Sequence, residues 1–173
     1  LMTKAKKEVM KLKIGIGVIA VFIVSISVFS GFRGVVIDSL SAVYGSVLVA
    51  LANNERSINN AGKLTVNATL ERAAQMKADD MASKGYFAHN SPEGKTPWYW
   101  FEQAGYNYEY AGENLAVNFN DSDEVHTAWV KSRGHFLNII NPRYTEIGIA
   151  TSTGMYKGRE AVFVVQMFGT PQK

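Results

Sequence analysis

Three short segments of the chain hold the residues most able to do chemistry. The first ends in His89, the second contains Glu113 and the third contains His135. Each segment lies beside a glycine or an expected helix end, where side chains tend to converge on a cleft. Imidazole and carboxylate groups transfer protons near neutral pH and also coordinate divalent metal ions. The segments are Gly85-Tyr86-Phe87-Ala88-His89, Ala111-Gly112-Glu113-Asn114-Leu115-Ala116 and Trp129-Val130-Lys131-Ser132-Arg133-Gly134-His135-Phe136-Leu137-Asn138-Ile139.

Helical patterns lie around these segments. An apolar stretch over 43–52 continues into Asn53-Asn54-Glu55-Arg56 and predicts a first helix. A second helix is predicted between Asn67, which can cap its start, and Gly85, which can end it in a left-handed conformation. Between those limits, apolar residues recur at helical spacing, namely Leu70, Ala73, Ala74, Ala78, Met81 and Ala82.

Two shorter helices are predicted further along. Pro97 suits a first helical turn, and Gly105 marks the end of that helix. Asp121 and Glu124 form a capping-box pattern, which predicts a helix from Ser122 to about Ser132 that Gly134 then breaks.

The rest of the chain predicts strands. Residues 144–152 and 160–168 are rich in β-branched and aromatic side chains and are joined across 154–158, which is typical of an antiparallel hairpin. Residues 106–117 contain the remaining strand candidate. Helices followed by an antiparallel hairpin indicate an α+β domain.

The order and spacing of these segments resemble the superfamily of cysteine-rich secretory, antigen 5 and pathogenesis-related 1 proteins, whose domain is called CAP or SCP, and specifically its cysteine-free bacterial branch. The resemblance runs from about Val47 to Gly169 and gives a domain over 47–170. It implies an α-β-α sandwich with a small antiparallel sheet flanked by helices. It also includes Asn53-Asn54-Glu55-Arg56, Ala73-Ala74-Gln75 and Tyr144-Thr145-Glu146-Ile147-Gly148-Ile149.

The resemblance also implies a site. In the family, two histidines and two acidic residues line a central cleft, and the histidines can bind zinc or another divalent ion. The matching positions are His89, Glu113 and His135. We expect the two histidines as metal ligands, because two neutral imidazoles and one carboxylate would leave a tetrahedral zinc with an open position for water. Glu113 is then a candidate base, a third ligand or a group that orients a histidine.

The fourth family position departs from the pattern. It is a glutamate in many eukaryotic members, and here it is Ser132, which is a poor metal ligand and a poor base at neutral pH. Asn114 and Asn138 are typical of the family, and we expect them to brace the cleft through hydrogen bonds to the backbone.

Each candidate also has a purely structural interpretation. His89 could cap or pack beside its own loop, His135 could satisfy carbonyls at a helix end, and Glu113 could bind backbone amides. His126 matches no family position and is expected on a helix surface. Glu146, at a strand start, is expected to be structural.

The amino-terminal part predicts a membrane anchor. Ile14 to Phe32 contains 19 residues without a charge, which approaches the length of a membrane-spanning helix, and five lysines precede it. The positive-inside rule then gives a cytoplasmic tail over 1–13, a transmembrane signal anchor over 14–32, a juxtamembrane connector over 33–46 and a domain outside the cytoplasm. The alternative is a signal peptide cleaved near Ser39-Leu40-Ser41-Ala42, which would release a secreted domain.

Composition excludes several functions. The chain has 173 residues, no cysteine and a net charge of +3, so disulfides and thiolate metal sites are impossible. Residues 1–13 carry five lysines and one glutamate, a charge of +4 that leaves −1 for the rest. A nearly neutral domain lacks the basic surface that nucleic-acid binding requires.

These features support two functions. The first is a membrane-anchored CAP domain that binds an envelope or extracellular ligand, such as a lipid, a sterol-like molecule or a peptide, in the His/Glu cleft. The second is a divalent-metal-dependent hydrolase acting on peptides or cell-envelope polymers. A structural adhesion role is a third possibility. The sequence leaves open whether the protein is an enzyme, since fold and family do not select one activity.

Overall fold

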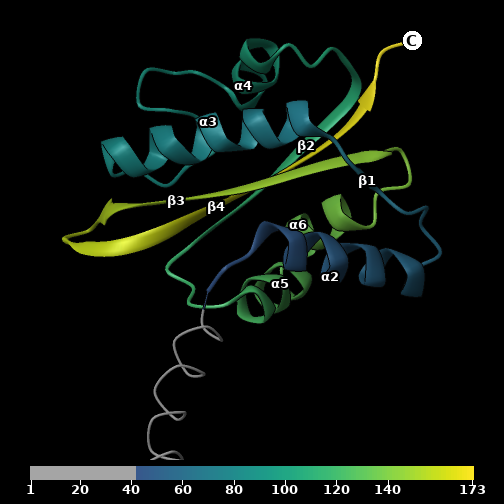
Figure 1. Cartoon of the computed structure of the whole chain (residues 1–173), viewed down its shortest axis with the longest axis horizontal. Coiled ribbons are helices and arrows are strands. Elements are labelled where there is room, and N and C mark those ends of the chain that lie inside the picture. The colour runs from purple at the N-terminus through teal and green to yellow at the C-terminus, as the bar shows by residue number, and fades with distance from the viewer. Residues whose placement is uncertain (1–41) are drawn as a thin grey trace, which may run out of the picture. The chain divides into compact units, whose positions relative to one another are not determined.

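The computed structural model of the chain describes residues 42–173. The predicted tail over 1–13, the transmembrane segment over 14–32 and most of the connector over 33–46 therefore lie outside the described residues. Within residues 42–173, no helix is long and apolar enough to cross a membrane. These residues form an α-β-α sandwich, with helices on both faces of one sheet (Figure 1).

The sheet has four strands in the order β1-β3-β4-β2. β4 pairs antiparallel with both β2 and β3, whereas β1 pairs parallel with β3. The prediction of an antiparallel sheet is therefore wrong at one edge. There the short strand β1 runs parallel to β3, which is possible because a long connection with helices separates the two strands in the sequence. The strands are β1 (Thr65–Val66), β2 (Tyr108–Val117), β3 (Glu146–Tyr156) and β4 (Arg159–Pro171).

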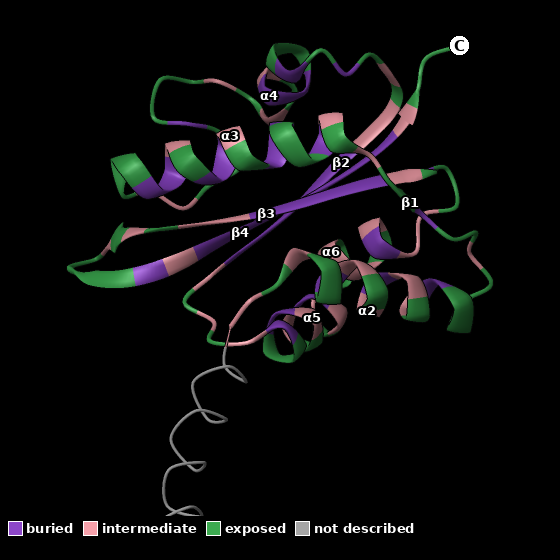
Figure 2. Ribbon diagram, in the orientation of Figure 1, coloured by how far each residue is buried: buried purple, intermediate pink, exposed green. Residues whose placement is uncertain are grey.

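The helices cover both faces of the sheet and turn their buried sides toward it (Figure 2). Two of them, α3 and α4, pack on one face, and the other three pack on the opposite face (Figure 1). The helices are α2 (Gly45–Ile58), α3 (Ala68–Lys84), α4 (Pro97–Ala104), α5 (Ser122–Lys131) and α6 (Arg133–Ile139).

The predicted helix ends of α3 are confirmed. The side-chain oxygen of Asn67 accepts hydrogen bonds from the amides of Thr69 and Leu70, which would otherwise lack partners in the first turn. Gly85 ends the helix with a φ of 68°, a left-handed conformation that glycine adopts without steric cost. The predicted limits of α4 are also confirmed, with Pro97 in its first turn and Gly105 after its last residue.

The predicted extent of α5 is confirmed, but the prediction that Gly134 breaks the helix is wrong. Asp121 caps this helix by accepting a hydrogen bond from the Glu124 amide, as expected. The break, however, is at Ser132, which is extended with φ −93° and ψ 114°, and Gly134 lies inside a further helix, α6. The sequence pattern missed this helix, because a glycine inside a short helix costs only about 1 kcal/mol relative to alanine and does not have to break it.

The hairpin between β3 and β4 is confirmed, but its turn is tighter than predicted. Gly154 pairs with Ala161 within the ladder, so the expected loop over 154–158 shrinks to Lys157 and Gly158. Their φ angles are 50° and 79°. Two consecutive positive φ angles suit a two-residue hairpin turn whose twist matches that of the flanking strands.

Each face of the sheet has its own hydrophobic core. The core under α3 and α4 includes Leu70, Met81, Phe101, Phe163 and Val165. The core under α2, α5 and α6 includes Leu48, Trp129, Ile147, Val164 and Phe168. Neighbouring residues of β4 belong to different cores because successive side chains in a strand point to opposite faces.

Two glycines of β3 allow α3 to lie directly on the sheet. A Cβ atom at Gly148 would be 2.2 Å from the backbone nitrogen of Glu71, and one at Gly154 would be 2.4 Å from the carbonyl oxygen of Ala82. Both contacts involve helix backbone, which cannot rotate away as a side chain can. The spacing between α3 and β3 therefore requires glycine at these positions.

We predict that Gly148→Ala destabilises the protein. The added methyl group must push α3 away from β3, and overpacking of this kind costs about 1–3 kcal/mol of the free energy of unfolding. Chemical denaturation measures the loss. Gly62→Ala is the matched control, because a Cβ atom there meets nothing within 4 Å. Equal stability of the two variants would contradict the predicted close packing.

Candidate functional site

The three candidate residues come from three different elements. His89 lies in the loop between α3 and α4, Glu113 lies in β2 and His135 lies in α6. β2 is an edge strand of the sheet. The loop of His89 belongs to one helical layer and α6 to the other, so residues from both layers can meet only around this edge. We call His89, Glu113 and His135 the His/Glu site.

His89 and Glu113 are in direct contact. The distance between His89 Nδ1 and Glu113 Oε1 is 2.7 Å. Because a carboxylate only accepts hydrogen bonds, Nδ1 is the donor and Nε2 is the ring nitrogen left for other partners. The side chain of Glu113 is 2% exposed, whereas that of His89 is 56% exposed. A buried carboxylate thus holds a half-exposed imidazole in a fixed orientation.

The second oxygen of this carboxylate is unusual. Glu113 Oε2 is buried and has no hydrogen-bond partner. Buried polar atoms are nearly always paired, since desolvation without a hydrogen bond is costly. Such an atom is a candidate acceptor for a water molecule or for a ligand group that enters the site.

The two histidines have different proton affinities. The hydrogen bond to Glu113 raises the pKa of His89, and burial opposes this effect without cancelling it. Burial and the nearby charge of His89 lower the pKa of His135. The site therefore favours protonation of His89 over protonation of His135. Environments that separate two pKa values in this way are typical of sites that bind or transfer protons.

An amide network ties α6 to β2. Asn138 Nδ2 donates to the carbonyl of Glu113 at 3.1 Å and to Asn114 Oδ1 at 2.9 Å. Asn114 Nδ2 in turn donates to the carbonyl of His135 at 3.1 Å and to Gln166 Oε1 at 2.9 Å. Both asparagines thus contact the backbone of a residue of the His/Glu site. The network fixes the distance between the helix of His135 and the strand of Glu113.

Side chains also cover the outer edge of β2. Asn118 N donates to Val162 O and so continues the antiparallel pairing of β2 with β4. In this register the N–H and C=O groups of the even-numbered residues of β2 point toward β4, and those of the odd-numbered residues point toward the outer edge. Three of those outward carbonyls accept hydrogen bonds from side chains of the α5 and α6 layer. The pairs are Ala111 O with Tyr144 Oη at 3.0 Å, Glu113 O with Asn138 Nδ2 at 3.1 Å, and Leu115 O with Trp129 Nε1 at 2.9 Å. Covering an edge strand in this way also opposes pairing with other chains.

Ser132, at the fourth family position, forms the junction between α5 and α6. Its amide donates to the carbonyls of Ala128 and Trp129, and its carbonyl accepts from Phe136 N. It therefore ends one helix and begins the next, three residues before His135.

Sequence reasoning missed two buried cations. Lys77 in α3 and Arg56 in α2 are both 0% exposed. Each occupies the apolar stripe of its helix, since Arg56 follows Leu48 and Ala52 at intervals of four and Lys77 lies four residues before Met81. A charged residue at a core position of a helical pattern is the signal that could have revealed them.

Arg56 holds the segment that follows α6. Its guanidinium donates to the carbonyls of Ile139 and Asn141 at 2.8 Å, to that of Tyr144 at 3.1 Å, and to that of Gly62. Four carbonyls from two segments thus replace the water that burial removes. They fix the end of the helix that carries His135.

The expectation that His126 lies on a helix surface is wrong. Its side chain is 14% exposed, and its Nε2 lies 3.9 Å from Glu55 Oε2 of α2, because α5 packs against α2 through this part of its surface. Burial lowers the pKa of His126. Glu146 is structural, as expected, and its Oε2 accepts from Asn67 Nδ2 at 3.0 Å and from Tyr106 Oη at 2.6 Å.

The donors of the His/Glu site fit a divalent ion only in part. Residues 42–173 contain no group of three or more histidine, aspartate and glutamate side chains placed to hold one ion. Glu113 Oε1 is committed to His89 Nδ1, whereas His89 Nε2, Glu113 Oε2 and the ring of His135 have no such commitment. A carboxylate that orients a metal-binding histidine is a common arrangement. Of the features of such a site, the structure shows the contact between His89 and Glu113.

A separate hollow lies away from this site. Its volume is about 610 Å³, and it lies between the loop after β2 and the tip of the β3–β4 hairpin. Its lining residues are Asn118, Phe119, Asn120, Tyr156, Lys157, Arg159, Glu160, Ala161 and Val162. None of the residues of the His/Glu site contributes to it.

Comparison with known proteins identifies relatives of the chain. Residues 49–168 match the family model described as the cysteine-rich secretory protein family, CAP. An uncharacterised protein of Bacillus subtilis, YkwD, is 40% identical over 112 residues, which cover 65% of this chain and 43% of that protein. A second protein of the same species, the uncharacterised membrane protein YlbC, is 27% identical over 63% of this chain and 32% of its own length. The chain thus spans less than half the length of these two relatives.

Solved structures with the same fold include two bacterial proteins. An extracellular SCP-domain protein of Bacillus anthracis has a TM-score of 0.62 and 27% identity, over 72% of this chain and 39% of that chain. An outer surface protein of Borrelia burgdorferi has a TM-score of 0.63 and 24% identity, over 73% of this chain and 92% of that chain. The latter shows a shared fold alone.

We predict that Glu113→Gln lowers the pKa of His89 toward its ordinary value. The hydrogen bond to the carboxylate is the main cause of the raised pKa, and an uncharged amide stabilises the imidazolium less. A pH titration of the His89 ring protons by NMR measures the shift. Glu93→Gln is the control, since this exposed carboxylate lies in the same loop but pairs with Lys84. A pKa of His89 that stays raised in Glu113→Gln would show that another group sets it.

Proposed function

The chain belongs to the cysteine-rich secretory protein (CAP) family, and we propose that its domain binds an envelope or extracellular ligand, a lipid or a peptide, at the His/Glu site. The observation that carries this proposal is the contact of 2.7 Å between the half-exposed imidazole of His89 and the buried carboxylate of Glu113. The pair presents a polar group to solvent, and the fold fixes the orientation of this group before any ligand binds.

The chemistry of the pair favours a ligand that carries a hydrogen-bond acceptor. Protonated His89 would offer Nε2–H and a positive charge to a carboxylate, phosphate or carbonyl oxygen. The neutral ring of His135 would add a donor or an acceptor nearby. These groups support recognition of the polar end of a lipid or of a peptide carboxylate.

Binding is also favoured over acid–base catalysis by what occupies the fourth position. Ser132 replaces the second carboxylate found in many eukaryotic members, and a serine hydroxyl does not act as a base at neutral pH. A mechanism that uses one carboxylate as the general acid and a second as the general base therefore lacks the second carboxylate beside Glu113.

We further propose that the protein is held at the cell membrane with this domain outside the cytoplasm. The uncharged segment over 14–32 and the lysines before it support a signal anchor. A secreted domain released by cleavage is the alternative. Fractionation of cells that express the chain with a carboxyl-terminal tag distinguishes the two, since only the anchored protein stays with membranes at full length.

Ligand binding through His89 gives a third prediction. Full-length protein in detergent, incubated with a lipid extract of the cell envelope and then washed, should retain a lipid species that mass spectrometry identifies. His89→Ala should weaken binding of that species by about tenfold or more, since a charge-assisted hydrogen bond is worth about 1.5–3 kcal/mol. His126→Ala is the matched control, because this histidine lies outside the site.

The same comparison with envelope-derived peptides tests the other ligand class. Retention of lipid and peptide alike by wild type and His89→Ala would refute binding at the His/Glu site.

A divalent-metal-dependent hydrolase is the second candidate function. It is favoured by the carboxylate at His89 Nδ1, which leaves Nε2 for a ligand bond, and by the lowered pKa of His135, which keeps that ring in its metal-binding form. His89 and His135 would hold a zinc or another divalent ion. Such an ion would supply a Lewis acid that polarises a substrate carbonyl. Glu113 would orient His89 and remain hydrogen-bonded to it.

We predict that zinc binding, if the site takes zinc, strengthens as the pH rises. The raised pKa of His89 means that a proton competes with the metal at low pH, and this competition disappears above that pKa. Calorimetric titrations of the full-length protein at about pH 6 and about pH 8 measure the difference. The double variant His89→Ala, His135→Ala should show no binding at either pH. Binding that survives the double variant would place any metal elsewhere and remove the basis for a hydrolase.

A further inference from the structure

A lysine lies buried beneath the loop that carries His89. Lys77, in the middle of α3, is 0% exposed. Its Nζ donates to Tyr86 Oη at 3.0 Å, to Ala88 O at 2.9 Å and to His89 O at 2.9 Å. An ammonium group has three N–H donors, so every one of them is used.

Burying this ammonium group is costly. Desolvation lowers the pKa of Lys77, while the charges of Glu113 and Asp80 act in the opposite direction. The aromatic rings of Tyr86 and Trp100 add support, with centroids 4.8 Å and 5.9 Å from Nζ. A methionine would fill the same volume without the cost of desolvating a charge. The bonds to the loop therefore give the lysine a role that apolar packing cannot supply.

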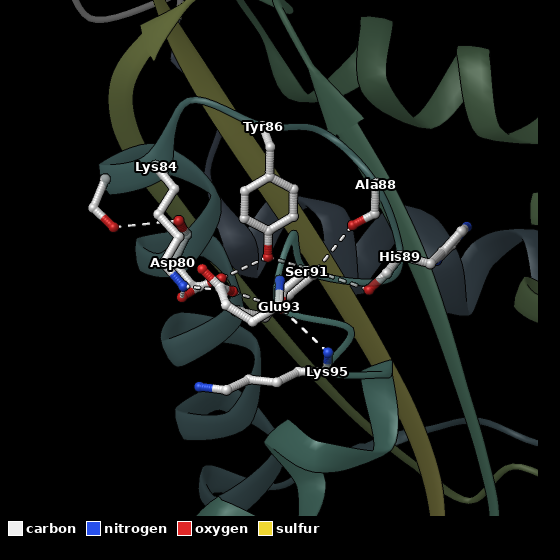
Figure 3. A network of polar contacts seen from close by, with 10 residues as sticks. Asp80, Lys84, Tyr86, Ala88, His89, Ser91, Glu93 and Lys95 are labelled. Atoms are coloured by element: carbon white, nitrogen blue, oxygen red, sulfur yellow. Dashed lines mark hydrogen bonds and ion pairs between the residues drawn. The ribbon is translucent and has the colours of Figure 1, made fainter.

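The loop is also tied to α3 at its outer side (Figure 3). Tyr86 Oη donates to Asp80 Oδ2 at 2.6 Å, and Lys84 contacts Asp80 at 2.6 Å and Glu93 at 2.9 Å. Ser91 Oγ donates to Glu93 at 2.8 Å. Lys77 and Lys84 thus hold two different parts of the same loop, the first from below and the second at the surface. The ring of His89 points away from this network (Figure 3).

We propose that Lys77 is a positioning residue of the His/Glu site, which fixes the backbone at Ala88 and His89 so that the His89 ring meets Glu113. This inference deepens the proposed function, since it names what holds the site in its binding geometry. Two consecutive carbonyls bound to one nitrogen leave the peptide group between them little freedom to rotate. The direction of the His89 side chain is set by that backbone, and a hydrogen bond weakens steeply when its geometry changes.

The resonance of the His89 Nδ1–H proton tests this proposal. A ring proton held by a carboxylate gives a far-downfield NMR signal, which disappears when the hydrogen bond is lost. In the full-length protein in detergent, Lys77→Met should lose this signal. Lys84→Met should keep it, because it makes the same substitution in the same helix but breaks only the surface pairs with Asp80 and Glu93.

Hydrogen exchange gives a second readout. The amides of Tyr86 and Ser91 are hydrogen-bonded, to Met81 O and Lys95 O, and flank the two carbonyls that Lys77 holds. Lys77→Met should speed their exchange by about tenfold or more, the effect of removing about one net hydrogen bond from the loop. Gly148→Ala separates this effect from a general loss of stability, since it disturbs the packing of α3 without touching the loop.

The outcomes decide the proposal. An unchanged downfield signal and unchanged exchange in Lys77→Met would overturn it. If Lys77→Met does not fold, Lys77→Gln takes its place, because its shorter, uncharged amide cannot reproduce the three bonds of the ammonium group, and an unchanged signal in this folded variant would equally overturn the proposal. Both readouts are made without ligand, so a failure here is distinguishable from a failure of ligand binding at His89.

Discussion

The site depends on two buried cations that are bound by backbone carbonyls. Arg56 lies on one face of the sheet and Lys77 on the other, and both are fully buried. Neither forms a direct ion pair among the residues that the structure describes. A buried charge without adequate partners is strongly destabilising, so each cation requires the carbonyls around it to stay in place. All of those carbonyls except that of Gly62 belong to the segments that carry or follow the two histidines. Displacing either segment would therefore leave a buried charge without its partners.

The edge strand β2 explains why the site lies where it does. Within a sheet, side chains on opposite faces are separated by the backbone, so groups from the two helical layers cannot touch across its centre. At the outer edge of β2, the loop of His89 comes from one layer and the amide network of α6 from the other, and both contact Glu113, through its carboxylate and its carbonyl respectively. The side chains that cover the outward carbonyls protect this edge and at the same time fix α5 and α6 against it.

Local chemistry made much of the fold predictable from the sequence. Asn67 and Gly85 set the two ends of α3, Asp121 starts α5, and the β-branched segments form the hairpin. Each of these residues or segments determines the conformation of the backbone around it, so its effect can be read from the local sequence. The features that could not be predicted depend on tertiary contacts. Ser132 is extended because α6 must turn toward β2, and β1 pairs with β3 only after the chain has crossed the sheet. The identity of the site residues followed from a resemblance. Their hydrogen bonds could not be predicted from the sequence, and neither could the carbonyls that bind Arg56 and Lys77, because these contacts join segments that are far apart in the sequence.

The hydrogen bond between His89 and Glu113 has opposite consequences for the two candidate functions. By raising the pKa of His89, it favours the imidazolium, which is a stronger donor to an anionic or carbonyl group. A metal ion requires the neutral ring, so the same bond places a proton in competition with the metal. His135 does not share this conflict, because burial favours its neutral form. Under the two proposals, an acceptor group would bind His89 while its ring is protonated, and a metal ion would bind only where that proton has been lost. Under either proposal, the protonation state of His89 decides whether its ring donates to a ligand or binds a metal ion.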